Sequence, residues 1–409
     1  MKILMLTSSF PRFIGDHQGN FVFHLARTQV ERGNTVLVVC PHIPKTLFHE
    51  TMEGVEIFRF PYFFPYRLQR LSSDTGMFSA LRHSLLAWFQ LPWYFFCQWH
   101  MAYRIIRKQN PGIIHSHWII PQGLIGALCH RLFDIPHIAT IHGTDLNLAK
   151  NSRFLQALCR LIVRNSAVVT INSSYMKKQL EEIVPEALKK NHTIPMGVDL
   201  SRFAAGIDPG YVRKNHETKI ILNIGRLIDW KGTVYLIKAM PEIVSGIPGV
   251  RLIIIGRGPQ EEVLRQKVRD LHLENHVEFP GTVSDDALIQ YYQSADVFVL
   301  PSVNLSGKTE GLGVVLLEAM ASRCPVIGSD AGGIPDIIRD GENGFLFPGG
   351  DEKMLAKRII ELLSDDTLAD RFRKAGYETV RMQFSWDGIA QRFSEVYGAV
   401  QNGPAEAGK

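Results

Sequence analysis

Short apolar runs alternate along the chain with polar segments that have helix-forming composition. In the first half the runs lie at 2–8, 35–40, 55–60, 112–118, 137–143 and 167–172. Helical stretches, such as 21–32 and 124–132, separate several of them. The alternation restarts with runs at 219–227, 250–256, 277–281, 297–302, 324–329 and 344–348. Continuous apolar runs of this length are typical of parallel strands covered on both faces. The pattern therefore predicts an α/β protein with two doubly wound, Rossmann-like domains.

A polar segment at 200–218, which contains Pro209 and Gly210, separates the two series of strands. We place the first domain at 1–200 and the second at 201–386. A last helix is predicted at about 387–400, in the segment 387–409. Open parallel sheets bind ligands beyond the carboxyl ends of their strands. Two such sheets that face each other would enclose a central cleft.

The segment from Pro301 to Met320 carries the most information about chemistry. A buried strand at 297–300 leads into a polar loop, and a helix is predicted from Leu312 to Ala321. Glu310 ends the loop and Glu318 lies inside the helix. Glycines at the helix start allow an anion to approach the free N–H groups and the positive end of the helix dipole. The spacing suits a nucleotide diphosphate sugar, with one carboxylate near each end.

Glu310 and Glu318 are separated by seven residues, and this resembles the E-x7-E signature of retaining glycosyltransferase family four, which has the GT-B fold. Further stretches agree with the family in order along the chain. They are HGTD at 142–145, MGVD at 196–199, GRLIDWKG at 225–232, AGGIPDII at 331–338 and NGFLFPGGD at 343–351. The resemblance covers nearly the whole chain. It implies an acceptor-side first domain, which the last helix rejoins, and a second domain that binds the nucleotide sugar.

The resemblance also implies roles for individual residues. His142 and Glu310 would lie beside the transferred sugar as catalytic residues. The donor would be bound by Gly19, Arg226, Lys231, Val283, Gly311, Leu312, Gly313 and Glu318, the last through the ribose hydroxyls. Asp145, His117 and Trp118 would lie on the acceptor side, although Asp145 is equally a candidate N-cap for the next helix.

Arg226 and Lys231 follow a buried strand and are two cations suited to hold a diphosphate. Charge grows on the phosphate as the glycosidic bond breaks, and cations placed in advance stabilise it. The chain contains no D-x-D pair, the usual source of carboxylates for a metal-bridged diphosphate. We therefore expect transfer without a metal ion or other cofactor.

The segment 58–108 is rich in aromatic and basic residues, and Asp74 is the only acidic residue between Glu56 and Asp134. The stretch 85–108 is too short in its apolar part for a spanning helix, and Pro92 is expected to break it. Aromatic residues with arginine and lysine are typical of a helix in the interface of an anionic membrane. The alternative is a core helix pair with a basic outer edge.

Bulk composition narrows the setting. Hydrophobic residues make up 45% of the 409 residues, and the net charge of +5 does not by itself indicate nucleic acid. Five scattered cysteines without a C-x-x-C pair favour a reducing, cytoplasmic compartment. We expect a peripheral protein at the inner face of the membrane. The sequence leaves the oligomeric state open.

The sequence thus predicts a retaining glycosyltransferase that moves a sugar from a UDP- or GDP-linked donor to a hydroxyl of a glycan or lipid-linked oligosaccharide, in surface polysaccharide assembly. The donor sugar and the acceptor are not specified. Three alternatives stay open: a sugar-nucleotide epimerase on the same fold, a non-catalytic nucleotide-sugar-binding protein, and a dinucleotide-dependent oxidoreductase. The last rests on GRGPQE at 256–261, which lacks the third glycine of G-x-G-x-x-G.

Overall fold

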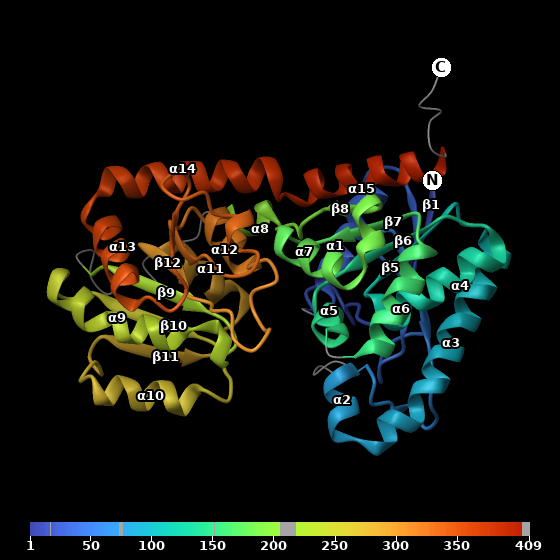
Figure 1. The fold of residues 1–409 in the computed structure, drawn as a ribbon, viewed down its shortest axis with the longest axis horizontal. Coiled ribbons are helices and arrows are strands. Elements are labelled where there is room, and N and C mark those ends of the chain that lie inside the picture. Colours follow the sequence, from blue (N-terminus) through green and yellow to red (C-terminus); the bar gives the residue numbers. More distant parts are fainter. Residues whose placement is uncertain (17, 73–76, 151, 205–217, 403–409) are drawn as a thin grey trace. The chain divides into compact units, whose positions relative to one another are not determined.

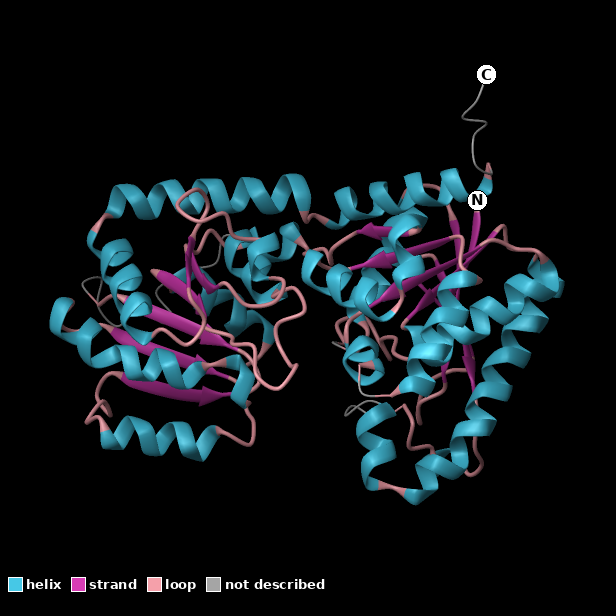
Figure 2. Cartoon of the chain, in the orientation of Figure 1, coloured by secondary structure: helices cyan, strands magenta, loops and turns pink. Residues whose placement is uncertain are grey.

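The computed structural model describes residues 1–16, 18–72, 77–150, 152–204 and 218–402. The chain forms two compact units, each an α/β assembly with helices on both faces of a sheet (Figures 1 and 2). The first comprises Met1–Asn172, Met176–Ile194 and Ile389–Lys409, and the second comprises Ser173–Tyr175 and Pro195–Gly388. The predicted fold class, α/β with two Rossmann-like domains, is confirmed.

The sheet of the first unit has eight strands in the order β3-β4-β2-β1-β5-β6-β7-β8. All its pairings are parallel except β3 with β4. The strands are β1 (Lys2–Leu6), β2 (Thr35–Pro41), β3 (His49–Met52), β4 (Val55–Phe60), β5 (Ile113–His117), β6 (His137–Ile141), β7 (Val168–Ile171) and β8 (Asn191–Thr193). The central strands β1, β5, β6 and β7 are almost wholly buried between two helical layers, although β5 carries His115, Ser116 and His117.

The helices of this unit lie between its strands in the chain, except α15, which follows the second unit. They are α1 (Asn20–Glu31), α2 (Met77–His83), α3 (Leu85–Gln109), α4 (Leu124–Phe133), α5 (Thr144–Ala149), α6 (Arg153–Arg164), α7 (Ser174–Ile183) and most of α15 (Trp386–Gln401). The last helix is bonded to this unit through buried polar groups. Gln29 donates to the Ala390 carbonyl at 2.7 Å, and His115 Nδ1 lies 2.7 Å from the Tyr397 hydroxyl.

The sheet of the second unit has six strands in the order β11-β10-β9-β12-β13-β14, and all its pairings are parallel. The strands are β9 (Ile220–Ile224), β10 (Arg251–Ile255), β11 (Val277–Gly281), β12 (Val297–Leu300), β13 (Val326–Ser329) and β14 (Phe345–Phe347). The helices are α8 (Leu200–Ala204), α9 (Thr233–Gly246), α10 (Glu261–Asp270), α11 (Asp285–Ser294), α12 (Val314–Ala321), α13 (Glu352–Ser364) and α14 (Asp366–Gln383).

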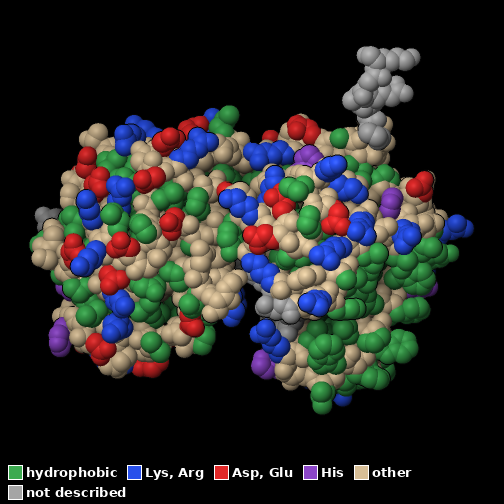
Figure 3. Space-filling model, in the orientation of Figure 1, with side chains coloured by type: hydrophobic (Ala, Val, Ile, Leu, Met, Phe, Trp, Pro, Cys, Tyr) green, Lys and Arg blue, Asp and Glu red, His purple; other side chains and the backbone are tan. Residues whose placement is uncertain are grey.

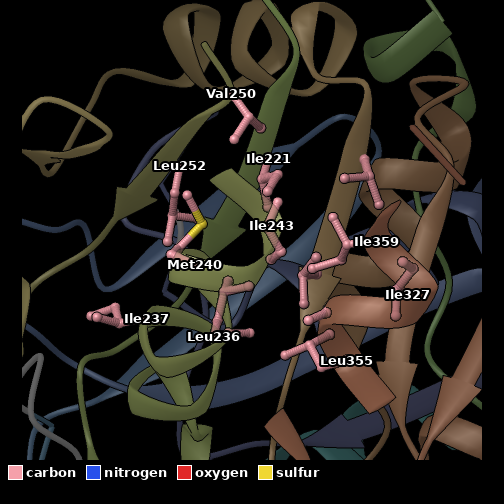
Figure 4. Packing of buried hydrophobic residues seen from close by; sticks show 14 of the residues in the cluster. Ile221, Leu236, Ile237, Met240, Ile243, Val250, Leu252, Ile327, Leu355 and Ile359 are labelled. Atoms are coloured by element: carbon pink, nitrogen blue, oxygen red, sulfur yellow. The ribbon is translucent and has the colours of Figure 1, made fainter. Parts of the chain in front are cut away.

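One face of this sheet is covered by α9 and α13, whose aliphatic side chains pack on β10, β9 and β13 (Figure 4). Leu236 and Met240 of α9 are fully buried there with Leu252, and Leu355 of α13 joins the same cluster. Replacing a buried leucine in such a core by alanine lowers the unfolding free energy by about 2–5 kcal/mol. The cluster holds the carboxyl ends of β9 and β12 in fixed positions, and the site described below is built on those ends.

Three details differ from the sequence predictions. The strands β3 and β8 were not predicted; both are polar edge strands, which need no continuous apolar run. The helix expected from Leu312 begins at Val314, because Gly313 has φ 95° and is its N-cap. The expected break at Pro92 is wrong, since α3 continues through it. A helix can pass through proline at the loss of one backbone hydrogen bond when packing supports both sides.

Candidate active site

An ion pair at the ends of β9 and β12 is the centre of the candidate site in the second unit. The chain after β9 makes a short 3₁₀ turn (Asp229–Lys231) that ends at Gly232, with φ 69°. A Cβ at Gly232 would lie 1.9 Å from the Pro301 carbonyl oxygen, so only glycine allows this contact. The close approach places Lys231 against the loop after β12. Lys231 Nζ donates to Glu310 Oε2 at 2.5 Å.

Glu310 is 9% exposed, so its charge requires partners. Besides Lys231, the buried Ser302 hydroxyl donates to the same Oε2 at 3.2 Å. The Glu310 carbonyl accepts from the Gly333 N–H at 3.0 Å, which anchors the loop to the segment after β13. Three residues later Gly313 caps α12, whose first-turn N–H groups provide the helix-terminal charge expected to favour an anion. Leu312, between them, is buried in the apolar cluster.

Glu318 lies in the middle of α12, among apolar neighbours. Its Oε2 accepts a 2.8 Å hydrogen bond from the hydroxyl of the fully buried Tyr292 in α11. Burial raises the pKa of Glu318 to about 7, although the Tyr292 hydrogen bond and the charge of Arg202 oppose the rise. Arg202 is itself ion-paired with Asp285. Glu318 is thus a carboxyl group that titrates near neutral pH.

The structure does not draw all predicted donor residues together. Arg226 follows β9 but is exposed, and no described residue forms an ion pair with it. Val283 lies after β11, partly buried against the apolar cluster that contains Leu312 and Leu316. Lys231 and Glu310 form a direct ion pair. Arg226 and Val283 lie near the strand ends, but within the described residues they make no polar contact with Lys231 or Glu310.

Gly19 begins the candidate site of the first unit. It caps α1 with φ 68°, and a Cβ on it would lie 2.3 Å from the Ser9 carbonyl oxygen. The loop after β1 therefore turns into α1 at a distance that only glycine permits.

An aromatic cluster lies at the carboxyl ends of β5 and β6. His117 is the last residue of β5, Trp118 follows it with φ 71°, and His142 follows β6. The His142 ring centroid is 4.8 Å from that of Trp118, 5.4 Å from that of His117 and 4.7 Å from that of Phe21 in α1. The structure thus brings three predicted site residues together, with Phe21 as a fourth member.

Electrostatically this cluster is neutral. Burial lowers the pKa of His117 to about 3 and holds the pKa of His142 well below its usual value, where the neighbouring His117 adds to the effect. Both imidazoles are uncharged at neutral pH. Asp145 belongs to α5, but its side chain lies outside the described residues, so neither of its predicted roles is tested.

Within the described residues no three His, Cys, Asp or Glu side chains are arranged to hold a metal ion. Metal independence stays a prediction.

Comparison with known proteins identifies the family of this chain. The description "Glycosyltransferase Family 4" matches residues 18–202, and "Glycosyl transferases group 1" matches residues 208–379. A GDP-mannose-dependent alpha-(1-6)-phosphatidylinositol monomannoside mannosyltransferase of Mycobacterium tuberculosis is 32% identical over 266 residues, which cover 63% of this chain and 68% of that protein.

The chain belongs to glycosyltransferase family 4.

Solved structures agree on the GT-B fold of this glycosyltransferase. A sucrose-phosphate synthase from Thermosynechococcus elongatus superposes with a TM-score of 0.76 at 23% identity, over 97% of this chain and 98% of that one. A protein of Anabaena, solved in complex with UDP and glucose, superposes with a TM-score of 0.69 at 20% identity, over 97% and 99% of the two chains. At these identities the likeness concerns the fold.

Sequence reasoning missed several residues that contact the candidate site. Phe21, Asn172, Tyr292 and Ser302 contact predicted residues but carry no motif. Asn172 follows β7, as His142 follows β6, and its position after a strand was the one signal that pointed to it. Tyr292 and Ser302 act through contacts that only the folded chain creates.

Proposed function

We propose that this glycosyltransferase moves a sugar from a UDP- or GDP-sugar to a hydroxyl of a glycan or lipid-linked oligosaccharide, in surface polysaccharide assembly, with retention of the anomeric configuration and without a metal ion. The observation that carries the proposal is the 2.5 Å pair of Lys231 with Glu310, three residues before the α12 N-cap. A cation, a buried carboxylate and a helix N-terminus suit a diphosphate joined to a sugar.

In the proposed reaction the acceptor oxygen forms a bond to the anomeric carbon while the bond from that carbon to the donor phosphate breaks. The acceptor proton passes to the leaving phosphate oxygen on the same face, and the nucleotide diphosphate departs. Negative charge therefore grows on the phosphate. Lys231 stabilises that charge, with Arg226 as the second cation, and neither needs to reorganise in the transition state.

Each carboxylate has a separate proposed task. Lys231 contacts both Glu310 and the donor phosphate. Glu310 also faces the positive charge that develops on the sugar ring. Glu318 accepts hydrogen bonds from the ribose hydroxyls. Its half-buried position supports this task, as does the hydrogen bond from Tyr292, which occupies only one of its two carboxylate oxygens. His142, His117 and Trp118 form the sugar and acceptor side in the first unit.

We also propose that the enzyme works as a peripheral protein on the cytoplasmic face of the membrane. One side of α3 packs into the core through Ala87, Tyr94 and Ala102. The opposite side exposes five large apolar residues: Leu85 at 90%, Trp88 at 57%, Phe89 at 64%, Trp93 at 52% and Phe96 at 53%. We call these five residues the α3 outer face. Figure 3 shows hydrophobic side chains gathered over α2 and α3.

Charge supports an anionic bilayer as the partner of the α3 outer face. Seven exposed basic residues lie on α3 or on segments that contact it: Arg67, Arg70, Arg82, Arg104, Arg107, Lys108 and Arg131. Each basic residue near such a surface contributes about 1 kcal/mol to binding. Aromatic side chains favour the headgroup layer. Among the described helices, none combines the length and apolar content that crossing a bilayer requires.

Vesicle binding tests the membrane proposal. The protein should sediment with phosphatidylglycerol-containing vesicles, and the double substitution Trp88→Ala/Trp93→Ala should abolish this. Phe154→Ala, which removes an even more exposed aromatic residue at the start of α6, is the control and should bind normally. Equal binding of both variants, or no preference for anionic over zwitterionic vesicles, would remove the α3 outer face from the account.

A donor screen tests the transfer itself. UDP- and GDP-sugars are incubated with the enzyme, first without and then with glycan acceptors, and products are identified by mass and anomeric NMR. Nucleotide release with an α-linked product from an α-linked donor supports the proposal. Interconversion of the sugar without transfer would indicate an epimerase, and donor binding without any turnover would indicate a binding protein.

A further inference from the structure

Three polar side chains meet at the carboxyl ends of adjacent strands in the first unit. His117 ends β5, His142 follows β6 and Asn172 follows β7, and these strands are neighbours in the sheet. Asn172 Nδ2 lies 3.3 Å from His142 Nδ1. His142 Nε2 lies 3.2 Å from His117 Nδ1. The strand register, which pairs Thr140 with Thr170 and His117 with Thr140, brings them into one row.

The chemistry of asparagine gives this row a direction. An amide nitrogen only donates, so Nδ1 of His142 must accept. Neutral imidazole has one N–H, and the proton of His142 is therefore on Nε2. That N–H donates to Nδ1 of His117, which in turn leaves the His117 proton on Nε2. The row thus runs from Asn172 through His142 to His117, and His117 Nε2 has no hydrogen-bond partner among the described residues.

The surroundings keep both rings uncharged. His115, whose ring centroid is 4.3 Å from that of His117, is itself bonded to Tyr397 and Thr140. His137 is bonded to Ser116 and Ser166. Phe21 and Trp118 cover His142. None of the Asp, Glu, Lys or Arg side chains that the structure describes is hydrogen-bonded or ion-paired to this row. Proton position is consequently set by Asn172.

We propose that Asn172 and His117 are positioning residues that hold His142 as the neutral Nε2–H tautomer, with both ring nitrogens engaged. The inference rests on the proposed function, because it concerns the histidine beside the transferred sugar. Its consequence is that His142 has no free nitrogen to remove a proton from the acceptor. The acceptor proton therefore goes to the leaving phosphate, as in the proposed reaction.

The substitution Asn172→Asp tests the direction of the row. A carboxylate accepts where the amide donated, so the proton of His142 moves to Nδ1 and the His117 proton follows to its own Nδ1. The pKa of His142 also rises. Asn172→Ser offers a hydroxyl that can donate or accept, so it is the intermediate variant that does not force the inversion. Asn110→Asp adds the same charge at the exposed end of α3 and is the control.

Side-chain ¹⁵N NMR measures the tautomers without any need for turnover. We expect Nε2–H on His142 and His117 in the native protein, unchanged between about pH 5 and about pH 9. Asn172→Asp should show Nδ1–H on both and lower kcat by about tenfold or more with little change in the KM for donor. Asn172→Ser should recover kcat in part, and Asn110→Asp should match the native enzyme.

Two results would overturn the proposal. One is Nδ1–H on His142 in the native protein. The other is an inverted row in Asn172→Asp with native kcat, which would make the row purely structural. If instead the native tautomers are as expected and no donor is turned over, the row stands and the proposed transfer fails, so the two failures are distinguishable.

Discussion

The candidate sites of the two units lie at the same place in similar sheets but use opposite electrostatics. In the second unit the strand ends carry an ion pair, Lys231 with Glu310, and a carboxyl group, Glu318, whose pKa is about 7. In the first unit the strand ends carry His117 and His142, which burial keeps neutral. The doubly wound sheet fixes where a ligand binds, and the side chains after each strand decide which part of the ligand it suits. Phosphate requires charge, whereas sugar rings and hydroxyls suit aromatic and neutral polar groups.

The largest expected effect comes from removing charge in the second unit. Lys231→Ala should lower kcat/KM for transfer by about 10²–10³-fold, as for the loss of one group that stabilises transition-state charge. It should also destabilise the fold, because Glu310 is left buried and unpaired. Lys231→Met combined with Glu310→Gln removes both charges. If this double variant regained full turnover, the charge assigned to the second unit would be unnecessary.

A glycine substitution examines the first unit, where close packing matters more than charge. Gly19→Ala introduces a left-handed φ penalty of about 1–2 kcal/mol and a clash with the Ser9 carbonyl. Gly15→Ala pays a similar φ penalty, but its Cβ has nothing within 4 Å. We expect Gly19→Ala to lose more unfolding free energy and more transfer activity than Gly15→Ala. Equal losses would show that the approach of α1 to Ser9 is unimportant.

Titration sharpens the comparison of the two candidate sites, because Glu318 has a pKa of about 7 whereas burial lowers the pKa of His117 and His142. If the ribose hydroxyls need ionised Glu318, donor affinity should rise about tenfold from pH 6 to pH 8, about one pH unit either side of its pKa. Glu318→Gln should make affinity independent of pH. A pH dependence that survives in Glu318→Gln would assign the titration to another group.

The same shift predicts the sign of a stability effect. The folded-state pKa of Glu318, about 7, lies above the ordinary value of 4.5, so the folded state keeps its proton longer. The stabilising contribution of Glu318 to the free energy of unfolding is fully present below the unfolded-state pKa. It is lost as pH rises from about 4.5 to about 7. Urea unfolding of the native protein and of Glu318→Gln across this pH range measures how the difference in unfolding free energy changes with pH. A native protein that gains stability relative to Glu318→Gln as pH rises would contradict the raised pKa.

The smallest expected effect is that of Tyr292→Phe. The Tyr292 hydroxyl stabilises ionised Glu318, so its removal should raise the pKa of Glu318 and move the pH midpoint of donor binding upward. The matched control is Tyr291→Phe, on the adjacent residue of α11. A midpoint that does not move, or moves downward, would show that Tyr292 only fills space.

The sequence predicted the parts of the molecule that depend on local pattern. The strands β4 and β11 were predicted to the residue, since their apolar residues recur with the two-residue period of a strand. The strands β3 and β8 were not predicted, because an edge strand can be polar and then lacks an apolar run. Lys231 and Glu310 were both predicted, yet their ion pair was not, since it depends on Gly232 reaching the backbone of Pro301. Tyr292 acts across the fold and has no signature in the chain, and Asn172 is marked only by its position directly after β7.

Nucleotide binding tests the central claim most directly. Titration calorimetry of UDP and GDP with native protein, Arg226→Ala/Lys231→Ala and Lys238→Ala, an exposed lysine of α9, compares the proposed phosphate site with a neutral substitution in the same unit. We predict that the double variant weakens binding of the preferred nucleotide by about 100-fold, while Lys238→Ala binds as the native protein does. Native affinity in the double variant would contradict the claim that these two cations hold the donor phosphates.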